Sequence, residues 1–272
     1  MTRLTVGTIE VTALSDGPFP ATLDSFIDFP RAEAERLVGG TQPLFLPVNC
    51  YLLRLGSKWA LVDTGCGQTM GPDLGQAPNN LRALGIAPET IDYVLLTHIH
   101  PDHALGLTDA SGHAVFPNAE LIVHEQEEAF WLNRDAGSGA SERIRRNIGK
   151  GQAATAPYRD RMRRVRDGEA LSGVSATLLP GHTPGHTGWI VHSGNDAVMM
   201  WGDVVHLPTV QVPRPDAALV FDVDPVMARA TRTRTFDRVA ADRLRVAGAH
   251  MDFPGFGYIV RQGTGYRFEP ES

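Results

Sequence analysis

Four side chains of the kinds that bind metal ions lie within six consecutive positions, in the run Thr97-His98-Ile99-His100-Pro101-Asp102-His103. Imidazole nitrogen and carboxylate oxygen suit Zn²⁺ and its neighbours in the transition series. Side chains two positions apart in an extended loop point the same way, so His98 and His100 can converge on one ion. Asp102 and His103 follow a proline, where the chain turns, and can face a second ion. Packing alone does not explain so dense a run, and the sequence therefore predicts a metal site here.

Three more residues of these kinds follow predicted strands later in the chain, namely His182, Asp203 and His250. His182 stands at the end of its strand as His98 does, so we expect it to complete a three-histidine set around the first ion. His186 is expected to support the loop instead. Asp203 offers two oxygens, and one carboxylate can bridge two cations.

The chemistry expected of such a pair of ions is hydrolysis. Bound Zn²⁺ lowers the pKa of its water to about 7, which gives a metal-bound hydroxide at neutral pH. Two ions can share that hydroxide and polarise the oxygen of the electrophile, so no serine or cysteine nucleophile is required. Asp102 is the expected catalytic residue, because it could both hold an ion and orient the hydroxide.

The hydrophobic pattern predicts the elements that must position these residues. Strands are expected at 4–14 with a turn at Gly7, 50–55 and 59–63, 93–96, 121–123, 175–179, 189–191 and 197–201, 246–249, and in a closing hairpin over 258–268. Helices are expected at 30–38, 78–85, 125–133 and 225–244. Two sheets packed face to face with helices outside would bury such strands, with the ligand-bearing strand ends along one edge.

Composition is that of an ordinary soluble globular protein. The 272 residues are 42% hydrophobic and 21% charged, and the net charge of -6 gives no reason to expect nucleic acid as a partner. Cys50 and Cys66 are the two cysteines, which argues against a disulfide scaffold. No apolar run has the length of a signal peptide or a membrane span, so we expect a cytoplasmic protein with no membrane partner.

Three segments carry less specific signals. Residues 17–47 are rich in proline and glycine yet hold several phenylalanines, which favours a loop that covers the site and that a homodimer partner could share. Asp63 follows a strand and could either hydrogen-bond a ligating histidine or only form a turn. The arginine-rich stretch 142–166 could bind phosphates, but a solvated helix face is favoured. No lysine or arginine stands beside a ligand motif, which favours a small, neutral, apolar substrate.

The motifs together resemble those of the metallo-β-lactamase superfamily. The resemblance rests on T-H-I-H-P-D-H at 97–103, G-H-T-P-G-H-T at 181–187, Gly202-Asp203 and Ala249-His250. It implies an α+β fold, the αββα sandwich, as a single domain over 1–272. It also implies two divalent metal ions, preferably zinc. By position, one ion would be held by His98, His100 and His182, the other by Asp102, His103 and His250, with Asp203 as the bridge.

The chain is similar in particular to the branch that contains methyl parathion hydrolase and related lactonases. That similarity rests on the stretches at 11–17, 61–65, 130–131, 253–257 and 265–268. It implies that Trp131 and Phe130 line the substrate pocket, with plain core as the alternative for Trp131. Met70 stands where the branch has an aromatic residue, and a flexible methionine should grip a flat aryl leaving group less well. We therefore expect opening of a lactone or cleavage of an aryl ester as the main activity.

Other functions carry weaker support. Phosphotriester hydrolysis of the methyl parathion hydrolase type is the first alternative, and a thioester hydrolase like glyoxalase II is a more distant one, because its glutathione-binding helices have no match here. A nuclease of this fold would need a basic face. A diiron redox protein would have glutamate in place of His100. A non-catalytic scaffold would be expected to have lost ligands, and none is missing.

Overall fold

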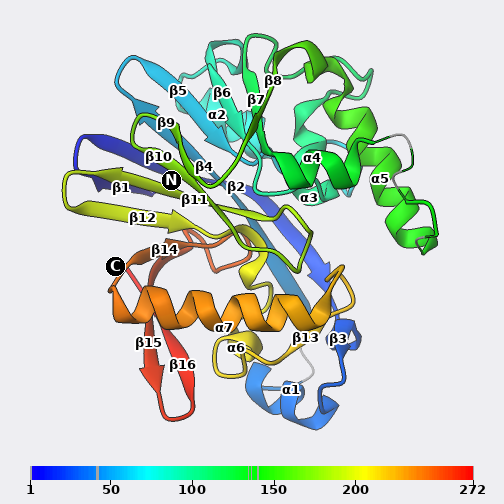
Figure 1. The fold of residues 1–272 in the computed structure, drawn as a ribbon, viewed down its shortest axis with the longest axis vertical. Helices are drawn as coiled ribbons and strands as arrows, with labels where there is room; N and C mark the ends of the chain where they lie inside the picture. Colours follow the sequence, from blue (N-terminus) through cyan, green and yellow to red (C-terminus); the bar gives the residue numbers. More distant parts are fainter. Residues whose placement is uncertain (1, 41–42, 134, 136, 140, 272) are drawn as a thin grey trace.

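The computed structural model describes residues 2–40, 43–133, 135, 137–139 and 141–271. Within them the long strands form two seven-stranded sheets that pack face to face (Figure 1). The first sheet runs in the order β1 (Arg3–Val6), β2 (Ile9–Ala21), β4 (Leu44–Leu55), β5 (Lys58–Val62), β6 (Tyr93–Leu95), β7 (Glu120–His124) and β8 (Met162–Val165). The second runs in the order β16 (Gly265–Pro270), β15 (Phe256–Gln262), β14 (Arg245–Ala247), β12 (Asp196–Met200), β11 (Thr187–Ser193), β10 (Val174–Leu178) and β9 (Gly168–Leu171).

Helices cover the outer face of each sheet, so the expected αββα sandwich is confirmed. The first sheet is covered by α2 (Ala77–Ala83), α3 (Pro101–Ala104), α4 (Glu125–Trp131) and α5 (Glu142–Thr155). The second is covered by α7 (Pro225–Ala241). A small sheet of β3 (Phe26–Ile27) and β13 (Ala218–Leu219) lies at one end with α1 (Arg31–Val38) and α6 (Pro208–Gln211).

Strand alternation sends neighbouring apolar side chains of one strand into different cores. Leu52 on β4 points toward the helices of the first sheet, and its neighbour Leu53 points between the two sheets. Val198 on β12 likewise joins the core between the sheets, whereas Met199 packs toward α7. The central strands β6 and β7 are buried on both faces, so they read as continuous apolar runs rather than as alternating ones.

The structure shows that residues 17–47 are not one loop, while their role as a cover over the site stays a prediction. The two ends of the segment 17–47 are strand, because β2 extends to Ala21 and β4 begins at Leu44. Its prolines suggested a loop, but beyond Thr12 the strand β2 pairs with β4 alone, and an edge strand tolerates residues without an amide hydrogen. The helix at 31–38 packs against α6.

The arginine-rich stretch is likewise not one helix. It divides into α5, a 3₁₀ turn at Ala156–Arg161 and the strand β8. None of the helices that the structure describes is long and apolar enough to span a membrane.

Candidate metal centre

The expected ligands meet at one edge of the sandwich. The strands β5 and β6 are parallel neighbours in the first sheet, and β12 and β14 are parallel neighbours in the second. Their carboxyl ends open toward the same place. His98, His100, Asp102 and His103 follow β6, and Asp203 follows β12. His250 follows β14, while His182 arrives on the loop after β10.

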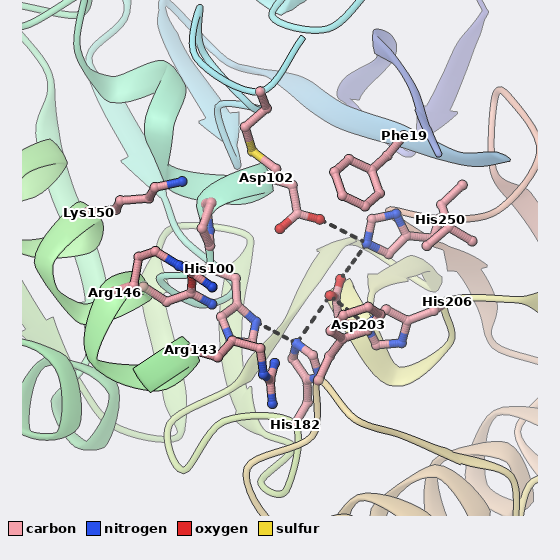
Figure 2. A pocket seen from close by; sticks show the side chains of 15 residues that line it. Phe19, His100, Asp102, Arg143, Arg146, Lys150, His182, Asp203, His206 and His250 are labelled. Carbon is pink, nitrogen blue, oxygen red and sulfur yellow. Dashed lines mark hydrogen bonds and ion pairs between the residues drawn. The ribbon is translucent and has the colours of Figure 1, made fainter. Parts of the chain in front are cut away.

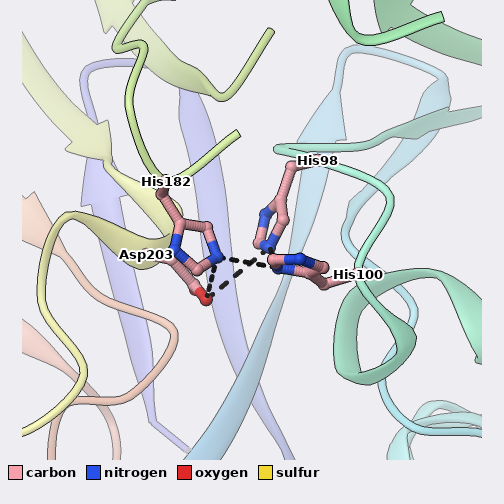
Figure 3. Close-up of side chains that lie close together, drawn as sticks. All are labelled: His98, His100, His182 and Asp203. Atoms are coloured by element: carbon pink, nitrogen blue, oxygen red, sulfur yellow. Dashed lines mark hydrogen bonds and ion pairs between the residues drawn. The ribbon is translucent and has the colours of Figure 1, made fainter. Parts of the chain in front are cut away.

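The first donor group joins three histidines and one carboxylate, His98, His100, His182 and Asp203 (Figure 3). The ligand atoms of the group all lie within 4.8 Å of one another. His100 Nδ1 is 3.1 Å from His98 Nε2 and 2.8 Å from His182 Nε2. Oδ2 of Asp203 lies 3.2 Å from His182 Nε2. Four buried donors at such distances can surround one tetrahedral ion.

The second donor group consists of Asp102, His103, Asp203 and His250. Here Asp203 uses its other oxygen, because Oδ1 lies 3.0 Å from His103 Nε2 and 3.3 Å from His250 Nε2. Oδ2 of Asp102 is 3.4 Å from His250 Nε2. Asp203 therefore reaches one group with each oxygen, as a bridging ligand must. Both groups also draw donors from both sheets, so neither half of the sandwich contains a complete group.

Unsatisfied buried atoms show that the donor set fits metal ions. Nε2 of His103, Nε2 of His250 and Oδ1 of Asp203 are buried and have no hydrogen-bond partner. All three belong to the second group and converge on one another. Buried polar atoms without partners are costly, and a shared cation would satisfy all three at once. Imidazole and carboxylate donors suit a pair of divalent ions, with zinc preferred.

Three of the ligand histidines are held at the ring nitrogen that faces away from the donor groups. His103 Nδ1 contacts Asp63 Oδ2 at 2.8 Å, and His182 Nδ1 contacts Asp222 Oδ1 at 2.9 Å. His250 Nδ1 contacts the Pro47 carbonyl oxygen at 2.7 Å. Such partners fix the ring orientation and the tautomer that presents Nε2 to a metal.

The structure decides between the two alternatives for Asp63, because its side chain contacts a ligand histidine and does not only form a turn. Besides its contact to His103, its carboxylate accepts hydrogen bonds from the amide and the hydroxyl of Thr97, at 2.8 and 2.7 Å. Its φ is 57°, a left-handed conformation that a residue with a side chain rarely adopts. The surroundings therefore impose a strained backbone that aims the carboxylate at the ligand loop.

Charge within the cluster keeps both carboxylates ionised. Burial opposes this, but His103 and His250 hold the pKa of Asp203 well below its usual range, and His103 does the same for Asp102. Burial lowers the pKa of His98 and His100 far enough to keep them neutral, which is the form that binds metals. Hydrogen bonds to Asp203 and Asp222 outweigh burial at His182 and raise its pKa to about 9. A cation bound there would replace that proton.

His186 has the supporting role expected of it. Its Nδ1 contacts the Leu179 carbonyl oxygen at 3.0 Å, and its Nε2 accepts the amide hydrogen of Asp203 at 2.9 Å. Burial lowers the pKa of His186 to about 3, so the ring stays neutral and can accept that bond. It thereby fixes the backbone of the bridging carboxylate.

Glu127 was missed in the sequence and ties the two main ligand loops together. Its buried carboxyl accepts hydrogen bonds from the Ile99 amide at 2.9 Å, the Thr183 hydroxyl at 2.7 Å and the Gly185 amide at 3.0 Å. Burial raises its pKa to about 7. Gly185 makes the contact possible, because a Cβ there would lie 2.0 Å from the Glu127 nitrogen. As one of three acidic residues at the start of a helix, Glu127 gave no signal of this role.

Asp222 and His206 were also missed. His206 Nε2 lies 3.0 Å from Asp203 Oδ2, and its position three residues after Asp203 was a signal that the sequence did contain. Asp222 precedes α7, where acidic residues commonly cap helices, and the structure shows that Asp224 is the cap. Only the fold reveals that Asp222 faces His182 instead.

A cavity of about 270 Å³ opens over both donor groups (Figure 2). Its floor includes His100, Asp102, His182, Asp203, His206 and His250, and its walls include Phe19, Leu46, Met70 and Phe221. Met70 thus lines the cavity, as expected.

Trp131 and Phe130 do not line this cavity, which corrects the expected pocket. Trp131 is 1% exposed and belongs to the core beneath the first sheet. Its ring meets the His100 ring edge-on, with 5.2 Å between centroids. Phe130 is partly buried against the same core. The alternative of plain core therefore holds for Trp131, because α4 turns it inward, behind the ligand loop.

Replacing Asp222 by alanine should weaken zinc binding by about ten- to hundredfold, because the His182 ring would lose the partner that orients it. Competition with a chelating dye measures this affinity. Asp222→Asn should retain most of it, since an amide oxygen can still accept from Nδ1. Asp216→Ala, an exposed change in the same segment, is the control. Equal affinities in all three variants would show that Asp222 does not support the metal ligand.

The sandwich and its paired donor groups define a known class. The profile of the metallo-beta-lactamase superfamily matches residues 43–248, and the chain belongs to that superfamily. Among solved structures it is similar to the hydrolase AbOPH of the beta lactamase superfamily, with 31% identity over 99% of this chain and 97% of that one and a TM-score of 0.94. It is also similar to AidC, a dizinc quorum-quenching lactonase, with 27% identity over 100% and 97% and a TM-score of 0.93.

A curated relative in the sequence comparison is also named as a lactonase. The N-acyl homoserine lactonase of Bacillus thuringiensis is 28% identical over 162 residues, which are 53% of this chain and 57% of that protein. The chain thus spans less than two thirds of the length of the first curated relatives it matches.

Proposed function

We propose that the protein is a hydrolase that depends on two divalent metal ions and opens lactones or cleaves aryl esters. One observation carries the proposal: the two oxygens of Asp203 enter two separate donor groups on the floor of a single open cavity. Two ions so placed supply a water of lowered pKa and polarise a carbonyl oxygen when they are bound. The similarity to proteins named as lactonases supports the carbonyl electrophile.

Asp102 is the residue proposed to transfer the proton of the attacking water to the leaving group. Its side chain is 21% exposed, whereas those of the partners it meets in the second group, His103 and His250, are each 1% exposed. It lines the cavity, and His103 keeps it ionised despite burial. Its carboxylate can therefore accept a hydrogen bond from the attacking water and carry that proton toward the oxygen of the leaving group.

The neighbouring apolar space suits an acyl group. A second cavity of about 100 Å³ shares Phe19, Leu46, His206 and Phe221 with the first. Its remaining walls include Phe26 and Leu219. A carbonyl held over the donor groups could place a short apolar chain there, and burial of each CH₂ favours binding by about 0.8 kcal/mol.

A substrate panel with metal-loaded protein tests this function. We expect kcat/KM to be highest for acyl homoserine lactones or a simple aryl ester, and lower for methyl parathion. Removal of the metals with a chelator should abolish turnover, and zinc should restore it, because the bound ions are what lowers the pKa of the attacking water. If methyl parathion gives the highest value, the protein is a phosphotriesterase. If no substrate turns over while two ions are bound, the proposed function is wrong.

A further inference from the structure

One face of α5 presents three cations to the cavity. Arg143, Arg146 and Lys150 all line it, together with Asn147 (Figure 2). These cations are spaced three and four residues apart, which places them on one side of a helix. The basic residues that were expected to form a solvated face thus lie opposite the metal donors. A neutral substrate was expected because no lysine or arginine stands beside a ligand motif in the sequence. The fold removes this reason, because it brings cations that lie some forty positions after the motif at 97–103 to the same cavity.

The helix that carries these cations is seated firmly on the ligand loop. Ile148 on its inner face is buried in the core. Gly151 allows close contact, since a Cβ there would lie 2.6 Å from Ile99 Cγ2. Arg143 is anchored as well: its guanidinium donates a hydrogen bond to the Val220 carbonyl and lies 5.7 Å from the centre of the Phe221 ring. The cationic face is therefore held in place and not free to swing away.

Two of the three cations on this face, Arg146 and Lys150, differ from other basic residues of the stretch in their charge partners. In the part of the chain that the structure describes, neither Arg146 nor Lys150 has an ion pair. By contrast, Arg164 and Arg166 pair with Glu128 and Glu125 at 2.8 and 2.7 Å. The cavity itself contains the carboxylates of Asp102 and Asp203, which two dications would more than neutralise. Bound metals would leave the cavity strongly positive.

We propose that the substrate carries a second, negatively charged group that binds Arg146 and Lys150 while its ester or lactone carbonyl lies over the metal donors. This inference rests on the proposed function and specifies its substrate class: an anionic ester or lactone. A carboxylate or a phosphoryl group would satisfy the same chemistry, since both form charge-assisted hydrogen bonds with guanidinium and ammonium groups.

Matched esters test the inference. The anionic substrate is mono-4-nitrophenyl glutarate, and its neutral counterpart is the methyl ester of the same compound. The wild-type protein should show a kcat/KM about ten- to hundredfold higher for the anion, the range expected for one or two hydrogen bonds to charged groups. The 4-nitrophenyl ester of 4-phosphonobutyrate then shows whether a carboxylate or a phosphoryl group is preferred.

Variants on α5 assign the preference to its cationic face. The double change Arg146→Gln and Lys150→Gln should remove most of the preference, and Arg146→Glu with Lys150→Glu should reverse it. Arg145→Gln changes a residue of the same helix that does not line the cavity, and should leave the preference unchanged. Circular dichroism and metal content show that each variant is folded and loaded.

Three results would contradict the inference: equal kcat/KM for both esters, a preference for the neutral ester, or a preference that survives in the double variant. If the loaded protein hydrolyses neither ester nor any lactone, the proposed function has failed instead. Calorimetric binding of the unreactive ether analogues of the two esters needs no turnover. Equal affinities there would overturn the anion site independently of the reaction.

Discussion

Replacing Asp203 by alanine should remove both metal ions and lower kcat/KM by about a thousandfold or more, because the two oxygens of this carboxylate serve both donor groups. Its removal also takes away one of the two carboxylates that face the imidazoles of His103 and His250 and leaves Asp102 as the other. Elemental analysis after reconstitution measures the metal content, and the esters described above measure the activity.

The matched control for this variant is Asp102→Ala. Asp102 belongs to the second group alone, so its loss should empty one position and leave the other filled. Asp216→Ala, an exposed change, should leave two ions in place. If Asp203→Ala loses only one ion, Asp203 is a terminal ligand and the bridging arrangement is wrong.

Replacing Trp131 by alanine should lower the free energy of unfolding by about 3–5 kcal/mol, the usual cost of removing a large aromatic side chain from a core. The cavity would open directly behind the ligand loop, since the Trp131 ring packs against His100. Denaturant unfolding at a fixed zinc concentration measures the change, because metal binding itself stabilises the folded state.

Two further variants make this prediction specific. Trp131→Phe should cost less, because it keeps part of the aromatic volume. Phe45→Ala removes a side chain that is 54% exposed and should change stability by no more than about 0.5 kcal/mol. If Trp131→Ala has unchanged stability but selectively loses turnover on apolar substrates, Trp131 contacts the substrate and the core assignment is wrong.

The metal donors could be predicted from the sequence because they lie in short, dense motifs at strand ends. The runs at 97–103 and 181–187 contain side chains that bind metals, and the structure brings both runs to one edge of the sandwich. The same reasoning placed the strand pairs around Gly7 and Gly56, where positive φ angles of 55° and 60° make the turns. Local signals are sufficient where chemistry and turn geometry are themselves local.

Two of the residues that sequence reasoning missed, Glu127 and Asp222, act across long distances in the chain. Glu127 meets residues on two loops, and Asp222 meets His182 forty positions away. The cations of α5 reach the cavity only because Gly151 seats the helix on Ile99. Neither a glycine nor an arginine reveals its partner by its neighbours in sequence. The homodimer and the location in the cell stay predictions.

The division of each donor group between the two sheets has a consequence for how an active molecule comes into being. His98, His100, Asp102 and His103 are synthesised long before His182, Asp203 and His250. A ribosome-bound chain that has folded only its first sheet contains half of the donors of each group, and the last donor, His250, is made after β12, α7 and β14. We therefore expect the complete metal centre to form late, once both sheets have assembled, and we expect partly made chains to be unable to hold the pair of ions.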